Sequence, residues 1–93
     1  MQIEYDPAKR DATLLKRGLD MAAASAIFET EILTVKDDRM DYGEVRFVTV
    51  GYMNGRMMFV AWTPRGGVRR IISMRKANDR EIAKFSIEQG FGD

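Results

Sequence analysis

The chain has 93 residues, enough for one modest hydrophobic core, so we expect residues 1–93 to form a single domain. It contains no cysteine and no histidine, which excludes disulfides, a thiolate nucleophile and sulfur-based zinc sites, and removes the commonest general base. The formal net charge is only +1, and 45% apolar residues suit a globular protein. We expect no cofactor and no metal.

The N-terminal third predicts one short strand and two helices. Residues 3–5 are a strand candidate, after which Asp6 can cap a helix and Pro7 can occupy its first turn. This helix is expected to run to about residue 17 and to end at Gly18. Its apolar stripe consists of Ala8, Ala12, Leu15 and Leu19. Asp20 then caps a second helix, whose apolar face carries Met21, Ala24, Ile27 and Phe28.

From residue 31 onward, apolar and polar residues alternate, which indicates strands. We expect strands at residues 31–35, 44–53, 56–63 and 68–75. The dipeptide Asn54-Gly55 predicts a two-residue hairpin turn, and residues 64–67 predict another turn. A polar connection is expected at residues 36–43.

The last element is expected to be a helix over about residues 79–89. Asn78 and Glu81 match a capping arrangement, and Gly90 offers a stop. The resulting order, β-α-α-β-β-β-β-α with an antiparallel meander, is typical of an α+β domain. We expect two helices to cover one sheet face and to leave the other face and its rim to basic residues.

The charges are divided unevenly along the chain. Residues 29–44 carry six acids and two bases, for a net charge of −4, whereas residues 56–80 carry seven bases and one acid, for +6. The bases of the second segment are Arg56, Arg65, Arg69, Arg70, Arg75, Lys76 and Arg80. Guanidinium groups bind phosphate oxygens in pairs, so this segment predicts a phosphate-binding surface. The alternative, that these are simply solvated charges, stays open.

The last strand carries the sharpest candidates. Strand alternation places Arg69, Ile71, Ser73 and Arg75 on one face, so Ser73 and Arg75 can share one phosphate. We interpret Arg70, on the other face, as a charge that discourages edge pairing.

Glu44 and Lys9 are the next candidates. Glu44 can pair with Arg46 on its own strand or with Arg56 across the hairpin, and an exposed pair of this kind contributes under about 1 kcal/mol. Lys9 lies in a first helical turn, where the helix dipole disfavours a cation by roughly 0.3–1 kcal/mol. A cation at a helix start can also help to bind phosphate.

Aromatic residues are interleaved with the basic strands, and aromatics beside arginines can stack on unpaired bases. Phe47 and Phe59 occupy alternating strand positions and are expected in the core. Tyr42 and Tyr52, near strand ends, are the candidates for base stacking.

Several motifs together resemble the BrnT family of bacterial toxins. They are D-P-A-K, L-x-K-R-G-L-D, V-R-F-V-T-V-G, G-R-M-M-F-V and R-R-I-I-S-M-R-K-A-N-D-R-E, and they span about residues 3–85. The resemblance implies a RelE-like fold and a ribonuclease toxin of a type II toxin–antitoxin system that stops translation. It also implies a BrnA-like ribbon-helix-helix antitoxin, a heterotetramer of two toxins and two antitoxins, and contact with operator DNA only through the antitoxin.

The resemblance also implies site residues. The family's polar positions are matched by Lys9, Glu44, Arg46, Arg56, Arg65, Ser73, Arg75 and Glu81. We expect catalysis by Lys9, Glu44, Arg56, Arg65 and Arg75. We expect RNA binding by Arg46, Arg69, Ser73, Lys76, Arg80, Tyr42 and Tyr52. The family usually has asparagine, histidine and alanine where this chain has Thr13, Arg17 and Met74, so a histidine-dependent proton transfer is lost.

The expected reaction needs no metal, because the 2′-hydroxyl of RNA can attack the neighbouring phosphate. Arg56, Arg65 and Arg75 would stabilise the phosphorane, Lys9 would assist charge or proton movement, and Glu44 would act as base. An alternative stays open, in which the basic face binds nucleic acid or an acidic protein without catalysis. The N-terminus carries no signal peptide, so we expect a cytoplasmic protein without membrane contact.

Overall fold

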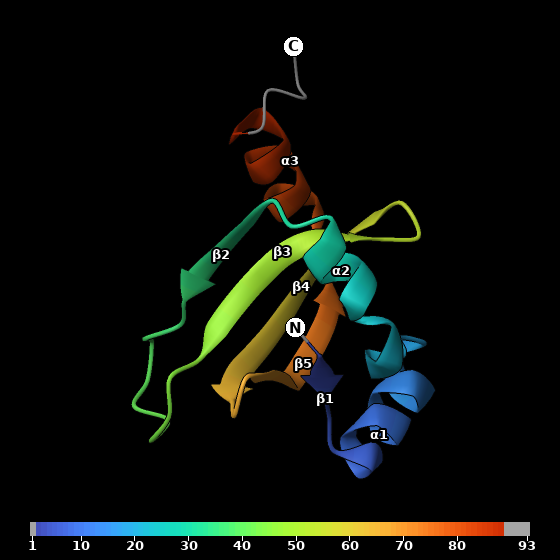
Figure 1. Cartoon of the computed structure of the whole chain (residues 1–93). Coiled ribbons are helices and arrows are strands. Elements are labelled where there is room, and N and C mark those ends of the chain that lie inside the picture. Colours follow the sequence, from blue (N-terminus) through green and yellow to red (C-terminus); the bar gives the residue numbers. More distant parts are fainter. Residues whose placement is uncertain (1, 89–93) are drawn as a thin grey trace.

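The computed structural model describes residues 2–88, which fold around a five-stranded sheet (Figure 1). The strands are β1 (Ile3–Glu4), β2 (Leu33–Lys36), β3 (Phe47–Met53), β4 (Arg56–Arg65) and β5 (Val68–Lys76). The helices are α1 (Pro7–Arg17), the 3₁₀ helix η1 (Met21–Ala23), α2 (Ser25–Glu29) and α3 (Asp79–Glu88). In space the strands follow the order β1-β5-β4-β3-β2; β2 to β5 form an antiparallel meander, and β1 pairs in parallel with β5. The α+β class is confirmed.

Local signals set the bounds of α1. The Asp6 carboxylate accepts a hydrogen bond from the Ala8 backbone N–H at 2.9 Å, and Pro7 opens the helix where a missing N–H costs nothing. Gly18 adopts the left-handed conformation with φ of 68°, and its N–H donates to the Leu14 carbonyl at 2.9 Å. The predicted helix from residue 7 to residue 17 is therefore confirmed.

The second helix is not continuous, and the prediction of one helix after Asp20 was wrong. Asp20 does act as a cap, because its carboxylate accepts from the Ala22 N–H at 2.9 Å. The chain then forms η1 before it turns into the short α2. Met21 lies in η1, Ala24 joins the two helices, and Ile27 lies in α2. All three side chains are buried.

The main core lies between the sheet and the η1–α2 segment. Its buried members are Leu19, Met21, Ala24, Ile27, Met58, Val60, Trp62, Ile71 and Met74. The Trp62 indole N–H donates to the Thr49 hydroxyl at 2.8 Å, so the one polar atom of this ring is satisfied. The Trp62 ring also contacts Phe28 and Phe47 at centroid distances of 5.8 and 5.0 Å.

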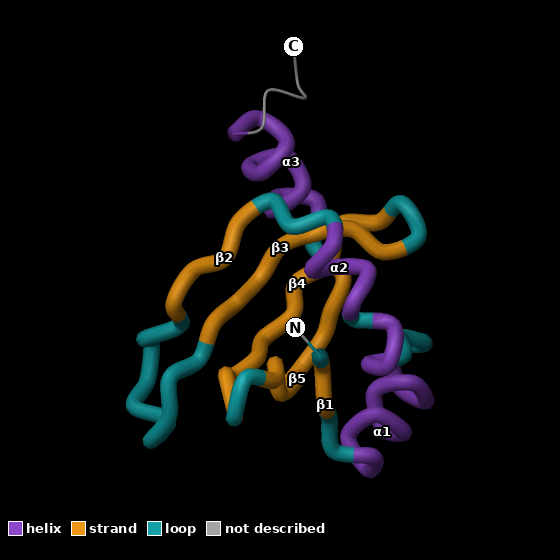
Figure 2. The backbone as a smooth tube through the Cα atoms, viewed as in Figure 1, coloured by secondary structure: helices purple, strands orange, loops and turns teal. Residues whose placement is uncertain are grey.

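Helix α1 lies at the edge of the sheet beside β1 and β5 rather than over its face (Figures 1 and 2). Within this fully described helix, no side chain is buried, and Leu15 is 87% exposed. Of the predicted apolar stripe, only Leu19 is buried, whereas Ala8, Ala12 and Leu15 are exposed, because η1 and α2 occupy the place over the sheet. Arg10 donates two hydrogen bonds, of 2.9 and 2.8 Å, to the Asp20 carboxylate, and this pair holds α1 to the start of η1.

Several strand bounds differ from the predictions by one to three residues. β2 begins at Leu33 and ends at Lys36. β3 begins at Phe47, because the segment between β2 and β3 closes as a loop through a bond of 2.8 Å from the Asp37 N–H to the Arg46 carbonyl. β4 continues through Pro64 to Arg65, because a proline near a strand end removes only one backbone N–H from the hydrogen-bond ladder.

At the start of α3, the Glu81 N–H donates to Asn78 at 2.8 Å and the Asn78 N–H donates to Glu81 at 2.9 Å, which confirms the predicted capping arrangement. The predicted helix end at residue 89 and stop at residue 90 lie outside the described residues.

A β-bulge in β5 reverses which sheet face the side chains before and after it occupy. Ala61 lies opposite Ser73 and Trp62 lies opposite Ile71, so Ile72 is the extra residue. Ser73 and Arg75 therefore share a face, as predicted. Arg69 and Ile71 lie on the other, helix-covered face, and the prediction that all four residues share one face was wrong.

Candidate functional site

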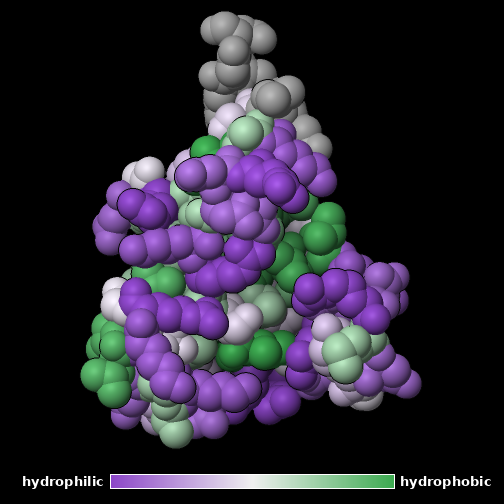
Figure 3. Space-filling model, turned by 180° about the vertical axis from the view of Figure 1, so that it is seen from behind, coloured by the Kyte–Doolittle hydropathy of each residue, from purple (hydrophilic) through white to green (hydrophobic). Residues whose placement is uncertain are grey.

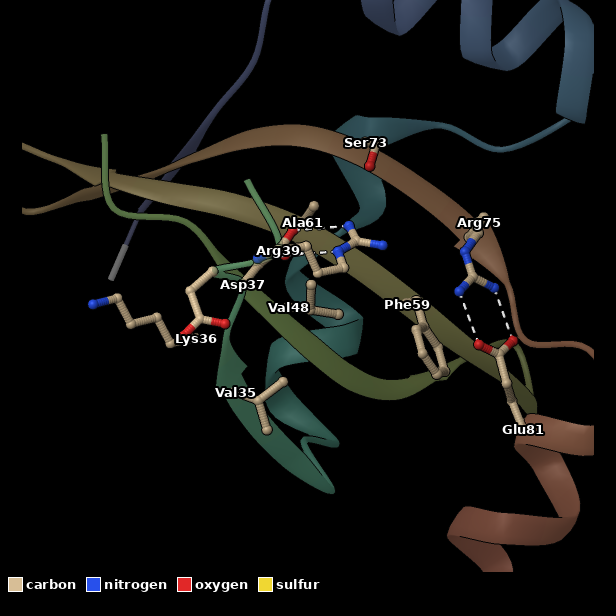
Figure 4. Close-up of a pocket in the computed structure, with 11 residues that line it drawn as sticks. Val35, Lys36, Asp37, Arg39, Val48, Phe59, Ala61, Ser73, Arg75 and Glu81 are labelled. Atoms are coloured by element: carbon tan, nitrogen blue, oxygen red, sulfur yellow. Dashed lines mark hydrogen bonds and ion pairs between the residues drawn. The ribbon is translucent and has the colours of Figure 1, made fainter. Parts of the chain in front are cut away.

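The sheet face opposite α2 is open, and its largest hollow has a volume of about 450 Å³. We call it the Arg75 hollow (Figure 4). Its floor is apolar and comes from Val48, Phe59 and Ala61, while charged side chains of the β2 end, β5 and α3 form its rim. Seen from behind in Figure 3, apolar side chains lie in a hollowed area between hydrophilic ridges. Among the described lining residues, three cations face three carboxylates, so this hollow has no net charge.

Arg75 has an internal partner. Its two terminal nitrogens donate to the two Glu81 carboxylate oxygens, each at 2.8 Å, and its guanidinium lies 4.5 Å from the centroid of Phe59 (Figure 4). The hydrogen bonds from Arg75 lower the pKa of Glu81 to about 2, and Glu81 in turn raises the pKa of Arg75. A phosphate at Arg75 must therefore compete with a carboxylate that is already bound.

Replacing Glu81 by glutamine is expected to destabilise the protein at neutral pH and progressively less as the solution is acidified. A carboxylate with a lowered folded-state pKa stabilises the fold above its ordinary value of 4.5, and this contribution is lost as pH falls toward about 2. Denaturant unfolding of both proteins across this range measures the difference. A difference that stays constant with pH would contradict the ion pair as its source.

A second hollow, of about 120 Å³, lies where α1 begins and β4 ends. We call it the Arg65 hollow. Its charged lining residues are Asp6, Lys9, Glu44, Arg46, Arg65 and Arg70. Four described cations face two lining carboxylates here, and a third carboxylate, that of Glu4, pairs with Arg70 at 3.5 Å, so the net charge is +1. Three of the expected catalytic residues, Lys9, Glu44 and Arg65, are brought together in this hollow.

Glu44 organises the Arg65 hollow. One of its carboxylate oxygens accepts from the Arg46 Nε at 3.1 Å, and the other lies 3.8 Å from an Arg65 terminal nitrogen. The pairing with Arg46 was one of the two predicted alternatives. The other, Arg56, is wrong, because Arg56 lies opposite Met53 at the far end of β4.

A third hollow, of about 210 Å³, lies between α1 and the edge of β5. We call it the Lys16 hollow. It shares Lys9 and Ile72 with the Arg65 hollow, and it shares Ser73 with the Arg75 hollow. The Lys16 hollow therefore adjoins both of the others, and we call this row of three hollows the strip along β5. Lys16 and Arg17 also line the Lys16 hollow, and they were not among the predicted site residues. The i, i+4, i+7 spacing of Lys9, Thr13 and Lys16 is a sequence signal that places these residues on one helix face.

The structure does not bring Arg56, Arg65 and Arg75 together. Arg56 and Arg65 begin and end β4, so about 30 Å of extended chain separates them. Figure 1 places the β3–β4 hairpin and the β4–β5 turn at opposite ends of the sheet. A single phosphate cannot contact both arginines.

Several expected RNA-binding residues lie elsewhere. The Arg69 guanidinium packs 4.2 Å from the Phe28 ring on the helix-covered face. Tyr52 packs against the second core cluster, formed by Val50, Met57 and Ala77. Lys76 pairs with Met58 at the end of β5, and Arg80 is exposed in the first turn of α3.

The structure shows what surrounds two further aromatic residues. The Tyr42 ring is covered by the Arg46 guanidinium at 3.9 Å, so this face of the ring is already occupied. Phe59 was expected in the core, but it is only half-buried and forms part of the floor of the Arg75 hollow. β4 turns this side chain toward the open face, where the Arg75 guanidinium lies 4.5 Å from the ring centroid and the Phe85 ring packs at 5.6 Å.

Within residues 2–88, no group of three or more acidic, histidine or cysteine side chains is placed to hold a metal ion. No helix in the same part of the chain is long and apolar enough to cross a membrane.

Comparison with known proteins identifies the family. A family model described as the ribonuclease toxin BrnT of type II toxin–antitoxin systems matches residues 5–81. No curated protein sequence matches the chain. The matched segment contains all the lining residues of the three hollows. The chain therefore belongs to the BrnT family, the ribonuclease toxins of type II toxin–antitoxin systems.

Proposed function

We propose that this toxin cleaves single-stranded RNA on the strip along β5, with the scissile phosphate in the Arg65 hollow. The distribution of charge carries the proposal. With the Glu4 carboxylate that pairs with Arg70 included, the Arg65 hollow has one more cation than carboxylates, whereas the Arg75 hollow is balanced. A phosphodiester is attracted to unbalanced positive charge, and this attraction is strongest where water is partly excluded.

The Arg75 hollow supports binding of a base next to that phosphate. Its apolar floor comes from Val48, Phe59 and Ala61, and the Arg75 guanidinium over the Phe59 ring offers a plane on which a base can stack. Ser73 lines the Arg75 hollow and the Lys16 hollow, and it supplies a hydroxyl that can donate to a phosphate oxygen. Such a strip accepts an unpaired strand, because its bases must be free to turn away from the backbone.

The proposed chemistry uses groups that the Arg65 hollow brings together. The Glu44 carboxylate takes the proton of the 2′-hydroxyl, and the 2′-oxygen forms a bond to phosphorus. Arg65 and Arg46 stabilise the charge that develops on the phosphorane oxygens. The bond from phosphorus to the 5′-oxygen breaks, and the Lys9 ammonium gives this oxygen a proton. The products are a 2′,3′-cyclic phosphate and a 5′-hydroxyl, and no metal is required.

RNA with 2′-O-methyl groups is expected to resist cleavage, because the proposed nucleophile is blocked. The measurement compares matched methylated and unmodified single strands with the purified toxin and a metal chelator, and it identifies the end groups of the products. Unmodified RNA should yield cyclic phosphate ends. Equal cleavage of both strands would contradict the mechanism. Loss of cleavage in the chelator would contradict its metal independence.

Family membership supports three further parts of the proposal. The fold is RelE-like, the toxin acts in the cytoplasm, and it is neutralised by a cognate BrnA-like antitoxin of the ribbon-helix-helix class. Two toxins and two antitoxins would form the complex, which would reach operator DNA through the antitoxin. The support is that a type II toxin is paired with a protein antitoxin.

A further inference from the structure

We infer that the Lys16 hollow is a second phosphate subsite, which holds the RNA backbone beside the scissile linkage. The identity of the ligand rests on the proposed function. The subsite itself rests on the charges, the spacing and the continuity of this hollow, which are independent of how the bond is broken.

The charge of the Lys16 hollow is unopposed. Lys9, Lys16 and Arg17 line it, and its described lining residues include no carboxylate. Within residues 2–88, no carboxylate oxygen lies within 4.0 Å of the cationic groups of these three side chains. Arg75 and Arg46, by contrast, each have an internal carboxylate partner. An anion entering here therefore does not compete with an internal carboxylate of the described residues.

The spacing of the cations suits a backbone rather than a single ion. Lys9 and Lys16 are seven residues apart, which is about 10 Å along a helix axis. Thr13 lies between them on the same helix face and adds a hydroxyl donor. Successive phosphates of a stacked strand are about 3.4 Å apart along its axis, so the row covers more than one phosphate.

Arg17 fixes the position of Lys9, Thr13 and Lys16 relative to β5. Its Nη1 donates to the Met74 carbonyl of β5 at 2.8 Å. In the described part of the chain, β1 pairs with β5 only through Arg69 and Arg70, so the rest of this edge has no strand beside it. This hydrogen bond satisfies one backbone carbonyl of the free edge and holds α1 beside β5. The Lys16 hollow, with its cationic wall, lies between α1 and β5.

The hollow also continues into the proposed site. Lys9 lines both it and the Arg65 hollow, and Ser73 lines both it and the Arg75 hollow. A strand whose scissile phosphate lies at Arg65 can therefore extend its backbone along α1. Lys16 is the cleanest probe of this extension, because it lines only the Lys16 hollow and makes no hydrogen bond or ion pair among the described residues.

The test replaces Lys16 by glutamine in the full chain and uses Lys84→Gln, an exposed position on α3, as the matched control. Binding of a single-stranded 2′-O-methyl RNA is measured as a function of salt. One lost phosphate contact should reduce the slope of log K against log salt by about 0.7 for Lys16→Gln. The slope of Lys84→Gln should equal that of the unaltered protein. With cleavable RNA, the ratio of kcat/KM for a long strand to that for a dinucleotide should fall only for Lys16→Gln.

Equal salt slopes in all three proteins would overturn the subsite. An equal loss on long and short RNA would also overturn it, because Lys16 would then act on the chemistry or the fold. A variant that binds RNA normally but escapes neutralisation by the antitoxin would assign the row to the protein partner instead. If the unaltered toxin binds RNA without cleaving it, the proposed chemistry fails, while the salt slopes still decide the subsite.

Discussion

Replacing Gly51 by alanine is expected to lower the free energy of unfolding by about 3 kcal/mol. Gly51 is buried in the middle of β3, and a Cβ atom placed on it would collide with the backbone carbonyl of Ile27 in α2. A backbone group cannot rotate away as a side chain can, so α2 has to shift as a unit. Thermal unfolding should show a fall in Tm of roughly 12–24 °C for a domain of this size.

Gly43→Ala is the matched control for this prediction. Gly43 has a φ of 72°, but no described atom lies within 4 Å of the place its Cβ would take. The same change there adds only left-handed strain, which costs roughly 1–2 kcal/mol. If the two variants lose equal stability, the close contact between α2 and β3 does not determine the cost at Gly51.

Replacing Arg65 by alanine is expected to lower kcat/KM for RNA about a hundredfold, which corresponds to a loss of about 2.7 kcal/mol of transition-state stabilisation. Arg65 lines the hollow that has unbalanced positive charge, and its nearest described carboxylate, Glu44, lies as far as 3.8 Å from it. Its guanidinium is therefore available to the phosphorane. Because Arg65 is exposed at the end of β4, the stability of the fold should change little.

The sequence predicts features whose signals act over a few residues. The bounds of α1 follow from Asp6 and Gly18, which decide locally where the helix begins and ends. The hairpin turn at Asn54-Gly55 follows from the positive φ of both residues, 53° and 74°. Each of these signals acts on neighbouring backbone groups and does not depend on what packs against the segment. Tertiary contacts therefore did not override it.

The features that the sequence did not predict depend on packing between distant segments. The bulge at Ile72 moves Arg69 to the opposite face from Ser73, and a register shift of one residue leaves no mark in the alternation of apolar and polar residues. Likewise, Glu81 is six residues from Arg75, and only the docking of α3 brings the two side chains together.

The candidate site was predicted only in part, because it too depends on packing between distant segments. A count of arginines indicates a phosphate-binding surface but cannot say which arginines are close together. Lys9 and Arg65 meet because α1 returns beside the sheet end where β4 finishes. Arg56, with the same side chain and on the same strand, lies about 30 Å away by chain length.

The rates of Arg65→Ala and Arg56→Ala on one single-stranded RNA therefore test most directly whether the phosphate lies in the Arg65 hollow. Both variants remove the same guanidinium from the same strand, so they change the net charge equally. A scissile phosphate in the Arg65 hollow predicts about a hundredfold loss of kcat/KM for Arg65→Ala and less than about a threefold loss for Arg56→Ala. Equal losses, or a larger loss at Arg56, would contradict it and would place the substrate at the other end of β4.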